Sequence, residues 1–279
     1  MDRASDRARL RDGTGWGGVA PIQAFRRRGG RVMSRTPRVL LVTGASRGIG
    51  GETARCAAER GYAVALNYST DHEGARETME TILEHGGTTV VVPADISHSG
   101  EVARLFDEVE DALGPITDVV NNAGVMGGPC RLEALSDDEL LNLFAINVFG
   151  TMYCCREAVR RIKARPEGPQ GRIVNVSSVA AKNGSAGERV HYAASKGAIN
   201  SFTLGLAKEV ARENIRVNAF SPGVTWTTLN PPGRVEAIEP SIPAGRAGTS
   251  REMAKGILWL LSDEAEYCVG TNLEMSGGR

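Results

Sequence analysis

The sequence predicts an α/β protein with one doubly wound, Rossmann-like sheet of seven parallel strands flanked by helices. Short apolar runs alternate with longer helical patterns from residue 37 onward, which is the order expected of βαβ units. The runs are mostly apolar and show no strict alternation, as expected for strands that are buried on both faces. A glycine-rich turn, TGASRGIG, joins the first run to the first helical stretch.

Seven apolar runs are the predicted strands. Their β-branched and aliphatic residues favour extended structure, and turn residues bound them. In chain order they cover residues 38–43, 62–68, 88–95, 116–124, 171–178, 215–223 and 271–276.

The segments between these runs have the length and pattern of helices, as the crossovers of a parallel sheet require. The second is rich in Glu and Arg and ends at Gly86 and Gly87. A loop rich in Pro and Gly precedes the last. The predicted helices cover the stretch after the glycine turn up to Arg60 and residues 71–85, 99–113, 136–164, 191–212 and 249–262.

Length and composition agree with one globular domain. The chain has 279 residues, of which 41% are hydrophobic and 24% charged, an ordinary globular composition. Basic and acidic residues balance at 33 each, so the chain as a whole offers no electrostatic reason to expect nucleic-acid or membrane binding. No apolar run approaches the roughly 18 residues of a membrane span.

The amino-terminal segment has a different character. Residues 1–36 hold nine arginines and three aspartates, a net charge of +6, without hydrophobic periodicity. They lack the apolar core of a signal peptide, and we expect a disordered extension. A nucleic-acid tail, a transit segment and an over-long gene start with Met33 as the true start remain open. We expect residues 37–279 to form the folded domain.

The cysteines argue against a disulfide framework and against a metal site. They number five and show no CxxC spacing, so neither disulfides nor zinc are expected. A reducing, cytoplasmic setting fits this pattern, and we expect no metal.

The glycine turn predicts a dinucleotide site. Gly44, Gly48 and Gly50 follow a strand and open a helix. Glycines let the backbone approach a pyrophosphate closely, and a helix N-terminus favours the negative charge. The spacing is G-x-x-x-G-x-G rather than G-x-G-x-x-G, so a glycine turn without a ligand is the alternative.

The end of the second strand favours NADP(H) over NAD(H). A carboxylate there would bind the ribose 2′-hydroxyl of NAD, whereas an arginine suits the 2′-phosphate of NADP. The strand ends Asn67-Tyr68-Ser69 with no carboxylate before Asp71, and Arg47 lies in the glycine turn. Its guanidinium can fork onto a phosphate, although a solvated loop charge is the alternative.

Tyr192 and Lys196 are the predicted acid–base pair. Positions i and i+4 share a helix face, and an ammonium one turn away is expected to lower the pKa of the phenol towards the working pH of a proton donor. Ser177 and Ser178 end the fifth strand at the edge where open α/β sheets bind ligands, and a hydroxyl there can donate to a carbonyl. A surface tyrosine and a hydroxyl bonded to local backbone are the alternatives.

Asparagines complete the set of candidate residues. Asn121 and Asn122 end the fourth strand, where they can bond either the cofactor or a local turn. Asn147 lies inside a predicted helix although Asn is a poor helix former, which indicates either a packing role or a place in a proton relay.

From Arg38 to Gly278 the sequence resembles the short-chain dehydrogenase/reductase (SDR) family of the classical type. TGASRGIG resembles the family's cofactor loop, NNAG (121–124) its central motif, YAASK (192–196) its Tyr/Lys pair, and SPG (221–223) with Thr227 its nicotinamide-side motif. Asn147 and Ser178 match the helix asparagine and the catalytic serine. Ser178 precedes Tyr192 by 14 positions, one more than the commonest family spacing, and choosing Ser177 would lengthen the gap further.

The resemblance implies a role for each residue. Tyr192 would be the general acid in reduction and the base in oxidation, and Lys196 would lower its pKa and bind the nicotinamide ribose. Ser178 would polarise the carbonyl, and Asn147 would hold a water in a proton relay. The implied cofactor-binding residues are Gly44, Ser46, Arg47, Gly48, Ile49, Gly50, Asn67, Tyr68, Ser69, Asp95, Ile96, Asn122, Ala123, Gly124, Tyr192, Lys196, Pro222, Gly223, Val224 and Thr227.

The predicted function is an NADP(H)-dependent oxidoreductase that interconverts a carbonyl and an alcohol by hydride transfer. The resemblance covers 3-oxoacyl reductases, sugar dehydrogenases and general ketone reductases. A non-catalytic NADP(H)-binding sensor or regulator on the same fold is the alternative, and an epimerase or dehydratase is a weaker one. We expect a small-molecule substrate, no nucleic-acid or membrane partner, and a homo-oligomer, dimer or tetramer, paired through the long helices.

Overall fold

The computed structural model describes residues 38–165 and 171–279, so the predicted extension, residues 1–36, lies outside the described residues. Seven strands form one parallel sheet in the order β3-β2-β1-β4-β5-β6-β9. The predicted sheet is confirmed, and every strand falls inside its expected range. The strands are β1 (Val39–Val42), β2 (Ala63–Tyr68), β3 (Thr88–Pro93), β4 (Ile116–Asn121), β5 (Gly171–Val176), β6 (Ile215–Pro222) and β9 (Asn272–Met275).

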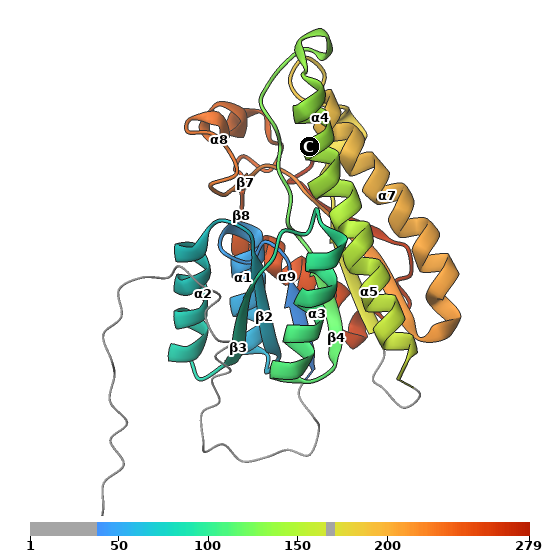
Figure 1. Ribbon diagram of the computed structural model, residues 1–279. Coiled ribbons are helices and arrows are strands. Elements are labelled where there is room, and N and C mark those ends of the chain that lie inside the picture. Colours follow the sequence, from blue (N-terminus) through green and yellow to red (C-terminus); the bar gives the residue numbers. More distant parts are fainter. Residues whose placement is uncertain (1–37, 166–170) are drawn as a thin grey trace, which may run out of the picture.

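Helices cover both faces of this sheet (Figure 1). One face carries α3 (Ser99–Leu113), α5 (Thr151–Lys163) and α7 (Val190–Val210), and the other carries α1 (Gly48–Glu59) and α9 (Ser250–Leu260), with α2 (His72–Glu84) beside α1. The remaining helices are α4 (Asp137–Phe144), α6 (Ala180–Asn183) and α8 (Arg234–Ile238).

Each face of the sheet has its own hydrophobic core because successive strand residues point to opposite sides. In β1, Val39 and Leu41 join the core beneath α3, α5 and α7, whereas Leu40 and Val42 join the core beneath α1 and α9. All four are at most 2% exposed. This two-sided burial explains why the strands are apolar without alternation, and it makes the sheet a rigid platform for the loops at its edge.

The strand order reverses between β1 and β4, and this is the place where open α/β sheets bind ligands. Asn122 joins the two strand ends. Its backbone N–H donates to Thr43 Oγ1 at 3.0 Å, and its side-chain amide donates to the carbonyl oxygens of Thr43 and Gly44, each at 3.0 Å. These three hydrogen bonds therefore connect the ends of β1 and β4, the two strands on either side of the crevice at the reversal.

The helix predicted at 136–164 is interrupted by a π-helical turn, Ala145–Gly150, between α4 and α5. Asn147 lies in this turn and is fully buried. Its Oδ1 accepts the Val125 N–H at 2.8 Å, and its Nδ2 donates to the Val125 carbonyl at 2.9 Å. The side chain thus pairs with the backbone of another segment. Turns of this kind are frequent at functional sites.

The loop rich in Pro and Gly that follows β6 contains structure that was not predicted. Two-residue strands β7 (Thr225–Trp226) and β8 (Gly248–Thr249) pair in parallel, and α8 lies between them. Val235, Ile242 and Ala247 form a small separate core. Arg234 of α8 donates to Glu188 at 2.6 Å, which ties this segment to the loop before α7.

Candidate active site

A cavity of about 540 Å³ lies at the carboxyl edge of the sheet, at the reversal of strand order. Its volume falls within the roughly 300–1,000 Å³ usual for small-molecule sites. The turns after β1, β2, β3 and β4 and the segment after β7 supply its walls. The lining residues are Gly44, Ser46, Arg47, Gly48, Ile49, Asn67, Tyr68, Ser69, Thr70, Asp71, Ala94, Asp95, Ile96, Asn122, Ala123, Gly124, Val125, Ile146, Thr227, Thr228 and Leu229.

The glycines of the turn are required by its geometry. Gly44 and Gly48 have φ of +63° and +58°, the left-handed region that side chains disfavour. A Cβ on Gly44 would lie 2.8 Å from Ala123 Cα, and one on Gly50 would overlap the Gly44 carbonyl oxygen. The turn therefore leaves bare backbone beside the start of α1, a combination that suits a phosphate group.

The outer end of the cavity holds an ion pair. Arg47 Nε lies 3.4 Å from Asp71 Oδ2, and the Arg47 side chain is 63% exposed. Asp71 also caps α2, since its Oδ1 accepts the Gly74 N–H at 3.2 Å. Sequence reasoning noticed Asp71 only as the first carboxylate after β2. The structure places it directly beside the arginine of the glycine turn.

Several predicted cofactor residues line the cavity while their polar groups bond to the protein. The Asn67 amide donates to the carbonyls of Ala94 at 3.0 Å and Val92 at 3.3 Å. The Tyr68 hydroxyl bonds to His72 Nδ1 at 2.8 Å. Asp95 accepts the Ser97 N–H at 2.9 Å. These contacts shape the wall on the β2 and β3 side.

Two of the predicted catalytic side chains, Asn147 and Lys196, meet at the opposite end, beside Gly124. None of the four predicted catalytic residues is itself among the lining residues of the cavity. A Cβ on Gly124 would lie 3.0 Å from Asn147 Oδ1 and 3.5 Å from Lys196 Nζ. The Lys196 ammonium donates to the Val176 carbonyl at 2.8 Å and lies 5.8 Å from the centre of the Tyr192 ring. Residues from β5, α7 and the π-helical turn thus meet beside the cavity wall.

The two candidate serines have different surroundings. Ser177 is 2% exposed, and its hydroxyl donates to the Lys196 carbonyl at 3.0 Å. Ser178 is partly exposed, its hydroxyl accepts the Ala180 N–H at 3.1 Å, and it lies close enough to the Tyr192 phenol to lower the pKa of that phenol. Ser177 therefore braces α7, and Ser178 is the serine next to the tyrosine.

Burial shifts the ionisation of both members of the Tyr/Lys pair. It raises the pKa of the Tyr192 phenol, while the hydrogen bond from Ser178 and the charge of Arg189 lower it in part. Burial lowers the pKa of Lys196 to about 8. The expected net lowering of the Tyr192 pKa by Lys196 is not met in this structure, because the ammonium is directed at the Val176 carbonyl and desolvation of the phenol dominates.

Of the residues predicted on the nicotinamide side, some line the cavity and others do not. Thr227 lines the cavity, and a Cβ on Gly48 would lie 3.5 Å from its Cγ2. Pro222, Gly223 and Val224 are not among the lining residues. The Gly223 N–H donates to the Met275 carbonyl, and the Val224 carbonyl accepts the Gly248 N–H, both at 2.9 Å. Lining residues that sequence reasoning missed, such as Ile146 and Leu229, carry no motif that could have indicated them.

The part of the chain that the structure describes, residues 38–165 and 171–279, contains no group of three His, Cys, Asp or Glu residues able to hold a metal ion. None of its helices has both the length and the apolar character needed to cross a membrane. All five cysteines lie in this part and are free thiols.

Known proteins resemble this chain over most of its length. A family model described as enoyl-(acyl carrier protein) reductase matches residues 44–279. The uncharacterized oxidoreductase YgfF of Escherichia coli is 44% identical over 245 residues, which cover 86% of this chain and 99% of that protein. The 3-oxoacyl-[acyl-carrier-protein] reductase of Bos taurus is 36% identical over 241 residues, covering 86% and 97%.

Solved structures also resemble this chain. A short-chain dehydrogenase from Burkholderia cenocepacia in complex with NADP matches with a TM-score of 0.81 and 30% identity, covering 88% of this chain and 98% of that one. The 3-ketoacyl-(acyl-carrier-protein) reductase of Brucella melitensis complexed with NADH has the same score and identity, covering 87% and 98%. By the family model and these relatives, the chain belongs to the short-chain dehydrogenase/reductase family of NAD(P)-binding oxidoreductases.

Proposed function

We propose that this protein is an NADP(H)-dependent oxidoreductase that interconverts a carbonyl and an alcohol, with Tyr192 as general acid and base. One observation carries the proposal: Lys196 and Asn147 meet beside Gly124, which lines the cavity at the sheet edge, and Ser178 lies next to Tyr192. When bound, the nicotinamide cofactor supplies or accepts the hydride. The protein then has to place the carbonyl and supply the proton.

Tyr192 supplies that proton in the direction of reduction. Because burial raises its pKa, the phenol is protonated at neutral pH and can donate to a developing alkoxide. The Ser178 hydroxyl, next to the phenol, can direct its single proton to the same oxygen as a second hydrogen bond. Two donors on one carbonyl oxygen both orient the substrate and stabilise the charge that develops on it.

We assign Lys196 to binding of the nicotinamide ribose and Asn147 to the route by which Tyr192 regains its proton. The Lys196 ammonium lies beside Gly124 on the cavity wall, where it can bind ribose hydroxyls. The Asn147 side chain pairs with the Val125 backbone and its Nδ2 also donates to Ser195 Oγ at 3.1 Å, so it holds this wall in place, and we assign to it the water of the proton relay.

The proposed preference for NADP(H) depends on Arg47. A planar guanidinium recognises a phosphate with two parallel hydrogen bonds, and Arg47 is the exposed cation at the outer end of the cavity. The bare backbone of the turn suits the phosphates of a dinucleotide, because Gly44 and Gly50 have no room for side chains and Asn122 braces the turn against β4. The remaining cofactor residues named from the sequence are proposed contacts around this framework.

The substrate class is proposed from the relatives. Reductases of 3-oxoacyl groups occur among them, so β-ketoacyl thioesters and β-ketoesters are the first substrates to test, followed by other ketones and by sugars. We also propose a homo-oligomer, paired through the helical segment from α4 to α5 and through α7, because Leu141 of α4, Phe149 of the π-helical turn and Leu204 of α7 are exposed. The free thiols support a reducing, cytoplasmic setting.

The decisive experiment follows NADPH oxidation by absorbance against a panel of β-ketoesters, ketones and quinones, with aldoses tested as oxidation by NADP. Wild-type turnover that is lost in Tyr192→Phe supports the proposal. NADPH binding without turnover of any substrate favours the alternative, a non-catalytic sensor or regulator. Absence of NADPH binding refutes the proposed cofactor.

The sensor alternative is less well supported by the geometry. A protein that only binds the dinucleotide needs the glycine turn and Arg47 but has no use for a serine next to a partly buried tyrosine. Retained NADPH affinity in both Ser178→Ala and Tyr192→Phe, together with lost turnover, would separate binding from catalysis and favour the enzyme.

A further inference from the structure

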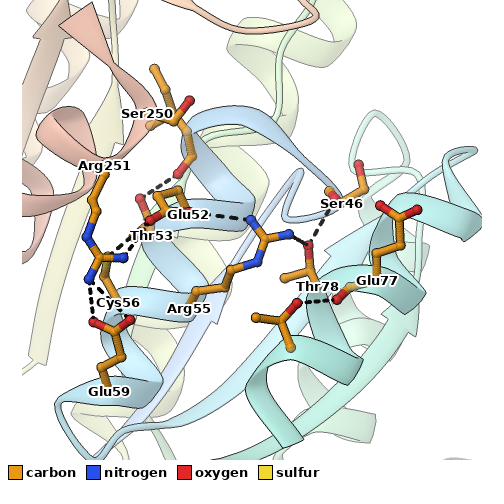
Figure 2. Close-up of polar contacts among 12 residues, drawn as sticks. Ser46, Glu52, Thr53, Arg55, Cys56, Glu59, Glu77, Thr78, Ser250 and Arg251 are labelled. Atoms are coloured by element: carbon orange, nitrogen blue, oxygen red, sulfur yellow. Dashed lines mark hydrogen bonds and ion pairs between the residues drawn. The ribbon is translucent and has the colours of Figure 1, made fainter. Parts of the chain in front are cut away.

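A fully buried threonine of α2 holds the glycine turn from behind. Thr78 Oγ1 donates to the backbone carbonyl of Ser46 at 3.0 Å (Figure 2). Thr78 does not line the cavity, whereas Ser46 and the next residue, Arg47, do. The contact therefore joins the turn to a helix that lies outside the predicted site.

The direction of this hydrogen bond is set by an arginine of α1. Arg55 Nη2 donates to Thr78 Oγ1 at 3.0 Å (Figure 2). A guanidinium can only donate, and a hydroxyl has a single proton. Because Arg55 occupies an acceptor position of the hydroxyl, the proton of Thr78 is directed to Ser46. Chains of this kind strengthen each member by polarisation.

Arg55 is itself held in place by a network that reaches α9. Its Nη1 lies 3.4 Å from Glu52 Oε2, and Glu52 Oε1 accepts from Arg251 Nη1 at 3.0 Å. Arg251 also donates to Glu59 at 2.9 Å. Three helices, α1, α2 and α9, thus meet behind the turn (Figure 2), and the position of Thr78 does not depend on a single contact.

The Ser46 carbonyl determines where the next backbone N–H points. In a planar trans peptide group the C=O and the following N–H are directed oppositely. With the Ser46 carbonyl held on Thr78, the Arg47 N–H points away from α2. The surroundings leave little freedom, since a Cβ on Gly51 would lie 3.2 Å from Thr78 Oγ1 and one on Gly74 would lie 2.9 Å from the Ser46 oxygen.

We propose that Thr78, oriented by Arg55, is a positioning residue for binding of the dinucleotide phosphates by the glycine turn. It touches no ligand; it keeps the Ser46–Arg47 peptide group in the orientation that presents an N–H to an anion and sends the Arg47 side chain to the outer end of the cavity. The inference rests on the proposed dinucleotide binding, and it adds a determinant of affinity that both NADPH and NADH would share.

The test compares Thr78→Val with Thr78→Ser in the full-length protein. The Kd values of NADPH and NADH are measured by titration of nucleotide fluorescence. We expect Thr78→Val to raise both by about ten-fold, the upper range of one net hydrogen bond, and to leave kcat at saturating cofactor within about two-fold because the tyrosine is remote. Thr78→Ser keeps the hydroxyl, and we expect both of its Kd values to stay close to those of the wild type.

The matched control is Thr81→Val, one turn further along α2. Its hydroxyl also bonds to a backbone carbonyl, that of Glu77 at 2.8 Å, but it is exposed to solvent. We expect no change in either Kd. If Thr78→Val does not fold, Arg55→Met carries the test. This variant leaves the threonine in place but vacates an acceptor position of its hydroxyl, so the hydroxyl proton can turn away from Ser46. We expect both Kd values to rise by about three-fold.

The outcomes separate this inference from the proposed function. Unchanged Kd values in Thr78→Val and Arg55→Met, with normal binding by the wild type, overturn the inference alone. A loss of dinucleotide affinity that occurs equally in Thr78→Val and in Thr78→Ser also overturns the inference, since the hydroxyl is then irrelevant. A wild-type protein that binds neither dinucleotide overturns both the inference and the proposed cofactor.

Discussion

The guanidinium of Arg47 lies 3.4 Å from the carboxylate of Asp71 at the outer end of the cavity. Asp71 in turn accepts the Gly74 N–H at the start of α2. The carboxylate therefore has two functions, as a helix cap and as a partner of the arginine. A phosphate that binds Arg47 has to compete with this carboxylate, so Asp71 bears on the choice between NADP(H) and NAD(H).

The first prediction is that Asp71→Asn lowers the KM for NADPH. Asn caps helices as well as Asp, so α2 is kept while the competition for Arg47 ends. Exposed ion pairs contribute about 0–1 kcal/mol, which limits the expected decrease to about five-fold. Arg47→Met should do the opposite, raising the KM for NADPH with little change for NADH. Equal effects on both cofactors in either variant would contradict a role in specificity.

The second prediction separates the two serines. Ser178→Ala should reduce kcat by about 10²-fold with little effect on the folded state, since it removes a donor at the reacting carbonyl. Ser177→Ala should retain most of the activity but lower the free energy of unfolding by about 1 kcal/mol, since it removes a buried hydrogen bond to α7. Steady-state kinetics and chemical denaturation of both variants check this assignment, and the reverse pattern would show that Ser177 is the catalytic serine.

The third prediction concerns pH and Lys196. Burial lowers its pKa from an ordinary 10.5 to about 8. Below pH 8 the lysine holds its proton in both the folded and the unfolded state, and the fold carries the full cost of a buried charge. Between pH 8 and 10.5 the folded state releases the proton while the unfolded state keeps it, so stability rises with pH. The difference in pKa corresponds to an upper limit of about 3 kcal/mol.

The measurement is urea denaturation of wild type and Lys196→Met at several pH values from 7 to 10. The stability of the wild type relative to the variant should increase over this range. Lys208→Met, which removes an exposed lysine from the same helix, is the matched control. A constant difference between wild type and Lys196→Met would mean that the lysine is not desolvated as the structure indicates.

The fourth prediction tests the glycine turn. A Cβ on Gly50 would overlap the Gly44 carbonyl oxygen, so Gly50→Ala has to displace the turn. We expect a loss of about 1–3 kcal/mol of stability from overpacking and loss of measurable NADPH binding. Gly100→Ala is the control, because Gly100 also lies in the first turn of a helix and a Cβ there meets nothing within 4 Å. Normal NADPH affinity in Gly50→Ala would remove the turn from the site.

The order of the elements was readable from the sequence because it depends on local patterns. Each buried strand is a short apolar run, and each crossover has helical length, so all seven strands fell within their predicted ranges. The glycines of the turn were readable for the same reason, since Gly44 and Gly48 adopt positive φ in the way that a tight strand-to-helix turn requires.

The interruption of one helix and the short elements of one loop were less predictable. Residues 136–164 have a continuous helical pattern, yet the π-helical turn at Ala145–Gly150 interrupts them. Asn147 in this turn pairs with Val125, a contact between segments that no local periodicity reveals. The structure of the loop after β6 was missed as well, because two-residue strands and a five-residue helix leave no pattern.

By itself the sequence determined the fold class, the place of the glycine turn and the identity of the residues with reactive groups, since these follow from composition and from neighbours along the chain. Only the tertiary structure decided that Ser178 rather than Ser177 meets Tyr192, that Asp71 pairs with Arg47, that Thr78 holds Ser46, and that burial raises the pKa of the tyrosine. The physical reason is that hydrogen-bond partners and desolvation are set by segments distant in sequence that the fold brings together.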